Sequence, residues 1–455
     1  MITGTGATPK WWRGSSPSSE RATDPLLKQG AAALSLAPAT RVRSPFALAM
    51  LFAFVGPGLM VMLADTDAGS VVTAAQSGAK FHYALIAPEL VLIPVLYVVQ
   101  EMTVRLGLTT QRGHGALINE MFGRRWAVVS AAALFVACVG ALITEFAGVA
   151  GVGELVGVPR WGSVGVCALA LVTLLLLGRY RRIEHVGIAV GALELLFLPA
   201  ALFAHPSVGA LVHGMAHPIV MSGGYMTLLA ANVGAVIMPW MIFYQQEAVI
   251  DKGRHGLDAR SALRFARLDT ATGAVVTQLI MVAIVIATAA TIGVSSHGHS
   301  LNSIGDIASA LTPFLGHRTA VLFFGLGMVG ASLVAALVVT LAGAWGISEV
   351  LGWRHSLNDS PRRAVGFYGL AVAGVVIGGA AVLVAPNLVN LSVDIEVLNA
   401  CLLPVVLGFL IALERRALPP ALRMHGVRRV MAYAMTSVVI VFGLVTIATV
   451  VGHLR

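Results

Sequence analysis

The sequence predicts an all-α integral membrane protein with eleven transmembrane helices, and three observations lead to that class. Of the 455 residues, 57% are apolar and only 11% are charged, whereas about a quarter of the residues in soluble domains are charged. Eleven apolar runs follow one another, each long enough to cross a bilayer. Basic residues gather on alternate loops. This composition excludes an ordinary soluble enzyme, a disordered chain and a nucleic-acid reader.

The apolar runs define the expected helices in chain order. The run at 126–157 is long enough for two spans, but it contains no turn signal, and we expect one tilted helix. Boundaries read from a sequence are uncertain by several residues. The expected helices lie at about 46–78, 83–106, 126–157, 162–178, 187–204, 224–250, 269–293, 318–351, 364–385, 393–413 and 429–451.

Residues 1–44 differ from the rest in composition. They are rich in Ser, Pro, Thr and Ala and lack the apolar core and cleavage site of a secretory signal. We therefore expect a disordered cytoplasmic tail, followed by a transmembrane domain at 45–455. The three cysteines, Cys138, Cys167 and Cys401, all fall in apolar runs, so no disulfide framework is implied.

The basic residues predict the orientation. With the N-terminus inside, the cytoplasmic segments carry 26 of the 30 Lys and Arg residues, and the outer segments carry only Lys80, Arg160, Arg318 and Arg455. This asymmetry follows the positive-inside rule. It supports eleven spans with a cytoplasmic N-terminus, and we expect the protein in the plasma (inner) membrane. It also accounts for the net charge of +9 without a nucleic-acid partner.

The eleven spans can be divided into repeat one (about 46–204), repeat two (about 224–413) and an extra helix (about 429–451). Each repeat begins with an apolar span that helix breakers interrupt. The first span contains Gly56-Pro57-Gly58 and Asp65–Ser70, and the sixth contains Gly234–Pro239. Interrupted spans at matching positions point to the substrate site of an inverted-repeat transporter. There, unwound backbone frees carbonyl oxygens that a bound cation can satisfy.

Four motifs in these helices resemble the Nramp family of divalent-metal transporters over about residues 50–415. The resemblance implies a LeuT-like five-plus-five inverted repeat with broken helices 1 and 6. It also implies secondary transport by alternating access, in the direction of uptake, and no enzymatic activity. The motifs are Gly56-Pro57-Gly58 with Asp67-Ala68-Gly69-Ser70 (family GPG…DPGN), Gly234–Pro239 (GAxxMPH), Thr340-Leu341-Ala342-Gly343 (TLAGQ) and the helix-10 stretch Glu396 to Pro404.

The resemblance also implies which residues meet the metal. Asp67, Ser70 and Met238 match side-chain ligand positions, Ala64 and Ala235 match positions that offer backbone carbonyls, and Glu396 stands where helix 10 of the family usually has glutamine. Gly69 and Pro239 mark the helix breaks. Glu145 resembles the third-helix glutamate of the proton route.

Physical reasoning supports Asp67 most strongly, because a charge at bilayer depth costs a few kcal/mol. If Asp67 and Glu396 line one site, their charge of −2 matches a divalent cation. Glu396 and Asp394 follow a loop, however, and could instead face the outer aqueous side. The thioether of Met238 favours Mn²⁺ and Fe²⁺ over Mg²⁺, although a methionine in an apolar helix is by default a packing residue.

The departures from the family pattern indicate a divergent branch. The proline and asparagine of DPGN are Ala68 and Ser70, and the two helix-6 histidines align with Trp240 and Gln245. The third-helix aspartate is Leu142, and the early helix-9 arginine aligns near Gly366. Because most residues that would handle protons are missing, we expect weak or absent proton coupling.

The sequence thus favours Mn²⁺ or Fe²⁺ as the transported substrate, with no cofactor, no nucleic acid and no obligate protein partner. One alternative is Mg²⁺ or another hard cation, moved without protons. Another is a carrier of organic solutes or sodium on the same fold, against which the paired carboxylates and Met238 argue. A membrane enzyme or sensor would need a catalytic constellation that is not visible.

Two further sets of residues receive little weight in this interpretation. The first set is expected at cytoplasmic helix ends or in packed polar contacts, and the second in solvated outer loops. The first set consists of Glu89, Glu101, Glu194, Glu247 and Glu349, and the second consists of the histidine pairs His213/His217 and His297/His299.

Overall fold

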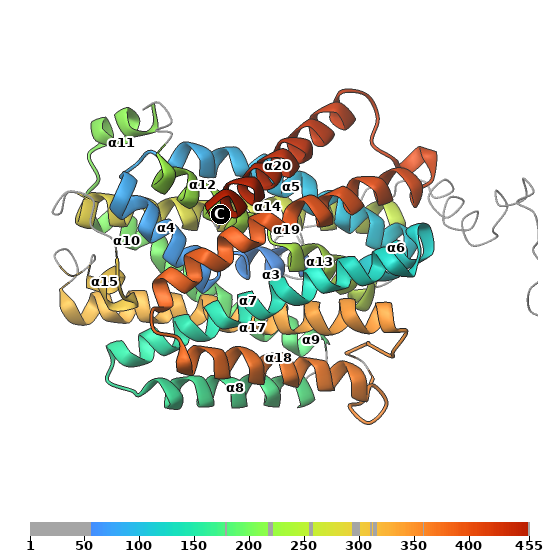
Figure 1. Cartoon of the computed structure of the whole chain (residues 1–455), viewed down its shortest axis with the longest axis horizontal. Helices are drawn as coiled ribbons and strands as arrows, with labels where there is room; N and C mark the ends of the chain where they lie inside the picture. The colour runs from blue at the N-terminus through green and yellow to red at the C-terminus, as the bar shows by residue number, and fades with distance from the viewer. Residues whose placement is uncertain are drawn as a thin grey trace, which may run out of the picture. The chain divides into compact units, whose positions relative to one another are not determined.

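The computed structural model describes residues 56–177, 180–216, 222–253, 258–293, 301–309, 312, 316–357 and 359–453. This part of the chain is helical and contains no strand (Figure 1). Ten of its helical segments are long and apolar enough to cross a membrane. The interrupted segment at 57–81 is the remaining one of the eleven expected spans. The expected tail at 1–44 lies outside the described residues.

The first half of the bundle follows the expected order. The long run at 126–157 forms one uninterrupted helix, α7, as predicted. Two short helices, α6 and α11, were not expected, because neither is long enough to appear as an apolar span. The elements are α3 (Pro57–Leu63), α4 (Ala68–Phe81), α5 (Ile86–Thr110), α6 (His114–Phe122), α7 (Arg124–Leu155), α8 (Arg160–Leu177), α9 (Tyr180–Gly191), η2 (Ala192–Leu196), α10 (Phe197–Phe203) and α11 (Val208–Met215).

The second half contains the other broken span, divided into α12 and α13. Its long helices again begin and end within several residues of the expected bounds, except that α14 starts about ten residues earlier. The elements are α12 (Gly223–Val236), α13 (Pro239–Lys252), α14 (Ala259–Thr288), η3 (Ala289–Gly293), α15 (Ile304–Ser309), α17 (His317–Leu351), α18 (Val365–Val384), α19 (Leu388–Arg416), η4 (Pro420–Leu422) and α20 (Gly426–His453).

Small residues allow the central helices to approach closely, as is usual in membrane bundles. A Cβ added to Gly148 of α7 would lie 2.5 Å from both Ala68 Cβ of α4 and Ser332 Oγ of α17. A Cβ on Gly346 of α17 would lie 2.2 Å from Leu134 Cδ2 of α7. Helices α4, α7 and α17 are therefore packed almost backbone to backbone.

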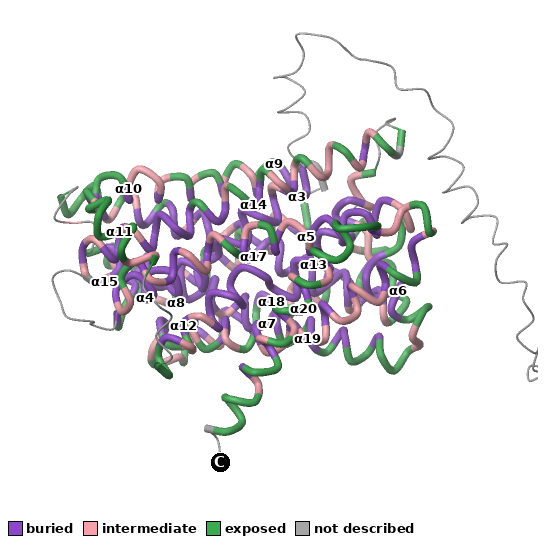
Figure 2. Tube along the Cα trace, turned by 90° about the horizontal axis from the view of Figure 1, so that it is seen from above, coloured by how far each residue is buried: buried purple, intermediate pink, exposed green. Residues whose placement is uncertain are grey.

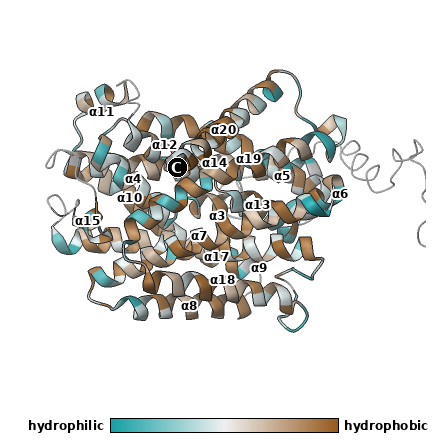
Figure 3. Cartoon of the chain, in the orientation of Figure 1, coloured by the Kyte–Doolittle hydropathy of each residue, from teal (hydrophilic) through white to brown (hydrophobic). Residues whose placement is uncertain are grey.

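Burial and hydropathy separate the central helices from the lipid-facing ones. Within the most apolar stretch of each span, 83% of the α12–α13 segment is buried, compared with 22% in α8 and 22% in α20 (Figure 2, buried residues in purple). The exposed positions of α8 include Trp161, Val166 and Leu169. In Figure 3 the hydrophilic colour is strongest near helix ends, for example at α6. Apolar exposed faces of this kind suit a surface in contact with lipid.

The Gly56-Pro57-Gly58 motif has a specific structural role at the start of α3. Pro57 occupies the first helical turn, where its missing N–H is not needed. The carboxylate of Asp269 in α14 accepts hydrogen bonds from the N–H groups of Gly56, Gly58 and Leu59 at 3.2, 2.8 and 3.0 Å. A Cβ on Gly58 would lie 2.6 Å from Asp269 Oδ2. Glycine is therefore required for α14 to cap α3.

A buried ion-pair network joins helices at the end of the bundle where the basic loops lie, called here the basic end. Glu101 of α5 is fully buried and pairs with Arg105, Arg267 and Arg428 at 2.8, 2.7 and 2.7 Å. Arg105 also contacts Glu414 at 3.3 Å. The network links α5, α14, α19 and α20. The burial of Glu101, one of the residues given little weight above, is thus explained by a structural role in this network.

Candidate functional site

The first broken span places a buried carboxylate at a helix N-terminus. The chain leaves the helical path after Leu63 and resumes it at Ala68. Asp67 caps α4, and its Oδ1 accepts a hydrogen bond from the Ser70 N–H at 2.7 Å. A carboxylate is favourable there, because helix N-termini present free N–H groups and positive potential. Its other oxygen, Oδ2, has no hydrogen-bond partner among the described residues.

The second broken span lies beside the first. Helix α12 ends at Val236, and Met238 precedes Pro239 at the start of α13. The hydroxyl of Ser70 donates a hydrogen bond to the backbone oxygen of Ala235 at 3.3 Å. The two breaks are thus in direct contact, as an inverted repeat requires.

Met238 is fully buried, and its sulfur has a partner that the family motif lacks. The indole Nε1 of Trp240 donates a hydrogen bond to Met238 Sδ at 3.0 Å. Trp240 stands where the resembling family has histidine. The side chain that replaces the histidine therefore holds the thioether rather than offering a ligand of its own.

Glu396 lies inside α19 and is fully buried, so the interpretation that it faces outer water is wrong in this structure. Its Oε2 accepts a hydrogen bond from Asn399 Nδ2 at 3.0 Å, and its Oε1 has no partner in the described part of the chain. A Cβ added to Gly69 would lie 2.2 Å from Glu396 Oε1 and 3.4 Å from Asp67 Oδ1. The two carboxylates therefore converge on the first turn of α4, directly after the break.

Glu145 of α7 completes this group. Its Oε2 accepts a hydrogen bond from the Ala68 N–H at 3.2 Å, and Thr144 Oγ1 lies 3.3 Å from its Oε1. The carboxyl groups of Glu145 and Asp67 are close enough to interact directly. The residue predicted for a proton route thus adjoins the predicted metal ligand.

A second acidic group next to this site was underestimated from the sequence. Thr277 of α14 lies 3.3 Å from Asp65 Oδ2 and 2.6 Å from Thr66 Oγ1. Glu194 of η2 lies close to Thr66, Asp67 and Asp65. Glu89 of α5 is also fully buried. Each of these residues is a carboxylate at bilayer depth, which the sequence does indicate. Their proximity depends on contacts between helices that are distant in the sequence.

The two groups together form a strongly electronegative interior. None of their six carboxylates forms an ion pair with a basic side chain within the described ranges. Buried charges without partners are costly, so the arrangement requires protons or cations. The six residues are Asp65, Asp67, Glu89, Glu145, Glu194 and Glu396.

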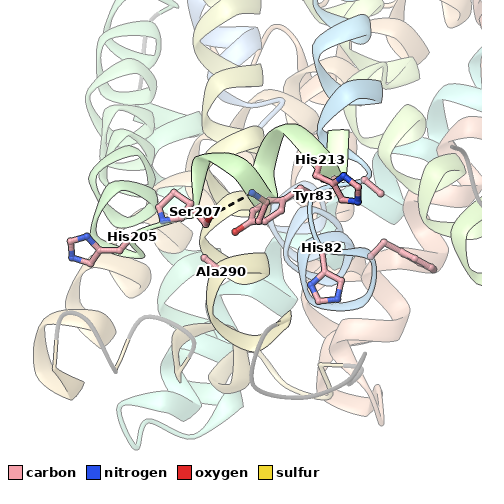
Figure 4. A pocket seen from close by; sticks show the side chains of 11 residues that line it. His82, Tyr83, His205, Ser207, His213 and Ala290 are labelled. Atoms are coloured by element: carbon pink, nitrogen blue, oxygen red, sulfur yellow. Dashed lines mark hydrogen bonds between the residues drawn. The ribbon is translucent and has the colours of Figure 1, made fainter. Parts of the chain in front are cut away.

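The histidines within the described ranges take no part in this site. Figure 4 shows a separate cavity of about 520 Å³ whose lining includes His82, His205 and His213. Its other lining residues come from the end of α4, the α4–α5 loop, the α10–α11 loop, α11 and η3, and none belongs to the acidic groups. His217, His297 and His299 lie outside the described residues.

The chain contains many membrane-spanning helices, and two of them are broken side by side around buried carboxylates. This arrangement is that of a multi-pass secondary transporter. The chain belongs to the natural resistance-associated macrophage protein-like (Nramp) family, whose model matches residues 58–449. Members of this family are secondary transporters of divalent metal cations and not enzymes. The resemblance found in the four motifs is thereby confirmed.

Curated relatives carry consistent names. The divalent metal cation transporter MntH of Bradyrhizobium diazoefficiens is 28% identical over 305 residues, which cover 64% of this chain and 67% of that protein. The MntH of Verminephrobacter eiseniae is 29% identical over 309 residues, 65% of this chain and 68% of that protein. The chain thus matches about two thirds of the length of these relatives.

Solved structures confirm the predicted fold. The Eremococcus coleocola manganese transporter superposes with a TM-score of 0.72 at 19% identity, covering 90% of this chain and 89% of that one. MhsT in complex with L-phenylalanine superposes with a TM-score of 0.54 at 14% identity, covering 90% and 99%. At these identities the likeness concerns the fold alone.

Proposed function

We propose that this protein transports Mn²⁺ or Fe²⁺ by alternating access, in the direction of uptake, across the plasma (inner) membrane with its N-terminus inside. The substrate site is formed by the side chains of Asp67, Ser70, Met238 and Glu396 and by the backbone carbonyls of Ala64 and Ala235. The observation that carries the proposal is the convergence of Asp67 and Glu396 on Gly69 at the break of the first span.

The donor set suits a divalent transition metal. Asp67 and Glu396 each contribute an oxygen that has no hydrogen-bond partner in the described structure, and their combined charge balances that of the ion. The sulfur of Met238 adds a soft ligand, which stabilises Mn²⁺ and Fe²⁺ relative to Mg²⁺. It has two lone pairs, so it can accept the Trp240 hydrogen bond and still face an ion.

Contact between the two breaks offers a path for alternating access. Ser70 and Ala235 join the outer halves α4 and α12, and the inner halves α3 and α13 begin or end at the same breaks. An ion bound between them contacts both repeats. Movement of one repeat against the other then exposes the ion first to one side and then to the other.

We expect proton coupling to be weak. Trp240 and Gln245 do not titrate, and Leu142 replaces the aspartate that precedes Glu145 by three residues in the family. Glu145 adjoins Asp67, so any coupling that does occur should depend on Glu145.

One observation favours a second candidate, transport of Mg²⁺ without protons. The Met238 sulfur already accepts a hydrogen bond from Trp240, and an ion that ignored the sulfur would meet only oxygen ligands. Carboxylate and hydroxyl oxygens are the donors that Mg²⁺ prefers.

The test is cation flux into proteoliposomes that contain the purified full-length protein. We expect saturable Mn²⁺ uptake, inhibited by Fe²⁺ and much less by Mg²⁺ or Ca²⁺, with little change when an inward proton gradient is imposed. Saturable Mg²⁺ uptake that ignores Mn²⁺ would favour the second candidate. Uptake of amino acids without metal flux would contradict both.

A further inference from the structure

A second cluster of metal-ligating side chains lies at the basic end of the bundle. Glu247 of α13, Glu349 of α17 and His355 of the following loop each offer a ligand atom within 4.8 Å of the other two. Both glutamates are buried. Glu247 is nine residues beyond Met238, or about 13 Å along the helix, so the cluster is separate from the substrate site.

Neighbouring groups orient two of these side chains. Glu349 Oε2 accepts a hydrogen bond from the Gly115 N–H at 3.0 Å, which leaves Oε1 to face the cluster. His355 Nδ1 lies 2.7 Å from the backbone oxygen of Trp353. Because a carbonyl can only accept, Nδ1 carries the hydrogen and Nε2 presents its lone pair. This arrangement is typical of histidines that bind metal.

The loop that carries His355 is itself attached to α13. Ser356 Oγ donates a hydrogen bond to Asp251 Oδ1 at 3.1 Å, and the Leu357 N–H donates to Asp251 Oδ2 at 3.3 Å. Asp251 lies one helical turn beyond Glu247. The imidazole is therefore held beside the carboxylate by a structured loop.

The two glutamates lie against each other. A Cβ on Gly113 would lie 1.6 Å from Glu349 Oε1 and 1.8 Å from Glu247 Oε1, so the two oxygens are close neighbours. No Lys or Arg pairs with either in the described part of the chain, and His355 forms no hydrogen bond to them there. Two adjacent carboxylates need a proton or a cation between them.

We propose that Glu247, Glu349 and His355 form a second divalent-cation site, distinct from the transport site. Opposite ligands of an ion bound at about 2.1 Å are about 4.2 Å apart, so small side-chain rotations would close these ligands around one ion. Two carboxylates with an imidazole suit Mn²⁺, Fe²⁺ or Co²⁺ better than Mg²⁺ or Ca²⁺. The proposal does not depend on the function proposed for Asp67.

The test is Mn²⁺ binding to the full-length protein in detergent, followed by electron paramagnetic resonance. Asp67→Ala is used as the background, so that the substrate site does not contribute. We expect this variant to bind one Mn²⁺ per chain, with a nitrogen coupling from imidazole in pulsed spectra. Adding Glu247→Gln should weaken binding at least about tenfold, and adding His355→Ala should abolish the nitrogen coupling. His425→Ala, a substitution of an exposed histidine at the basic end, is the control and should change neither.

Three results would overturn the proposal. They are an Asp67→Ala protein that binds no Mn²⁺, bound Mn²⁺ without nitrogen coupling, and binding that is unaffected by Glu247→Gln. The two carboxylates would then share a proton instead. If wild type and Asp67→Ala bind the same number of ions, the assignment of Asp67 fails while this second site stands, so the two failures can be told apart.

Discussion

Single side chains in and beside the proposed site distinguish it from the family pattern. Trp240 replaces a histidine and donates a hydrogen bond to the sulfur of Met238. Ser70 replaces an asparagine and donates to the backbone of the other broken span. Glu396 replaces a glutamine and brings a second negative charge to the break. These changes alter the charge and softness of the site while keeping its position.

Met238 is expected to set selectivity more than rate. A thioether binds transition metals but interacts little with Mg²⁺, so Met238→Ala should lower the preference for Mn²⁺ over Mg²⁺ by about tenfold, equivalent to about 1.4 kcal/mol. Competition between the two ions for uptake measures this preference. An equal loss for both ions would mean that Met238 serves only packing or gating.

Glu145 is expected to carry whatever proton movement accompanies the metal. Mn²⁺ entry into proteoliposomes should acidify the lumen only slightly, and an inward proton gradient should barely accelerate uptake. A pH-sensitive dye inside the vesicles reports this, with Glu145→Gln as the comparison. Strong acidification that Glu145→Gln removes would restore ordinary proton coupling.

The sequence could predict those site residues that lie within a recognisable motif. Asp67, Ser70 and Met238 belong to helix-breaking segments, and the structure brings these two segments into contact through Ser70 and Ala235. The sequence alone could not predict the grouping of Asp65 with Glu194, because their proximity depends on how η2 and α14 pack against the first break. The pairing of Glu247 with Glu349 could not be predicted either, because it depends on the packing of α13 against α17.

At the scale of elements, the two breaks have different causes. At the first break, Asp67 starts a new helix by capping it. At the second, Pro239 supplies the first residue of α13 and cannot donate a hydrogen bond to the preceding helix. The start of α3 depends instead on Asp269 of a different span, which ties the first half of the broken helix to α14.

Asp269 is therefore expected to be important for stability. Asp269→Ala leaves three backbone N–H groups without their acceptor, and each unsatisfied buried group costs about 1–3 kcal/mol. We expect a destabilisation of at least about 3 kcal/mol, seen as a lower melting temperature in detergent. Asp258→Ala removes the exposed carboxylate that caps the same helix α14 and is the matched control, with a much smaller effect. Equal melting temperatures for both variants would contradict this role.

For the whole molecule, simple physical chemistry determined most of the architecture. Spans of about 20 apolar residues and the alternation of basic loops were enough to place all the long helices. The short helices α6, α11 and α15 were not predicted, because they do not cross the membrane and leave no apolar run. The packing of α4, α7 and α17 depends on glycines whose partners are far away in the sequence.

Metal uptake by wild type and Asp67→Ala in proteoliposomes tests whether the carboxylate of Asp67 is essential for transport. Asp67 is the buried anion of the break, and its Oδ2 has no partner among the described residues. We expect saturable Mn²⁺ uptake by the wild type and none by Asp67→Ala, although the variant remains folded and monodisperse in detergent. Near-normal uptake by Asp67→Ala would contradict the account, because transport would then proceed without the carboxylate on which the site is built.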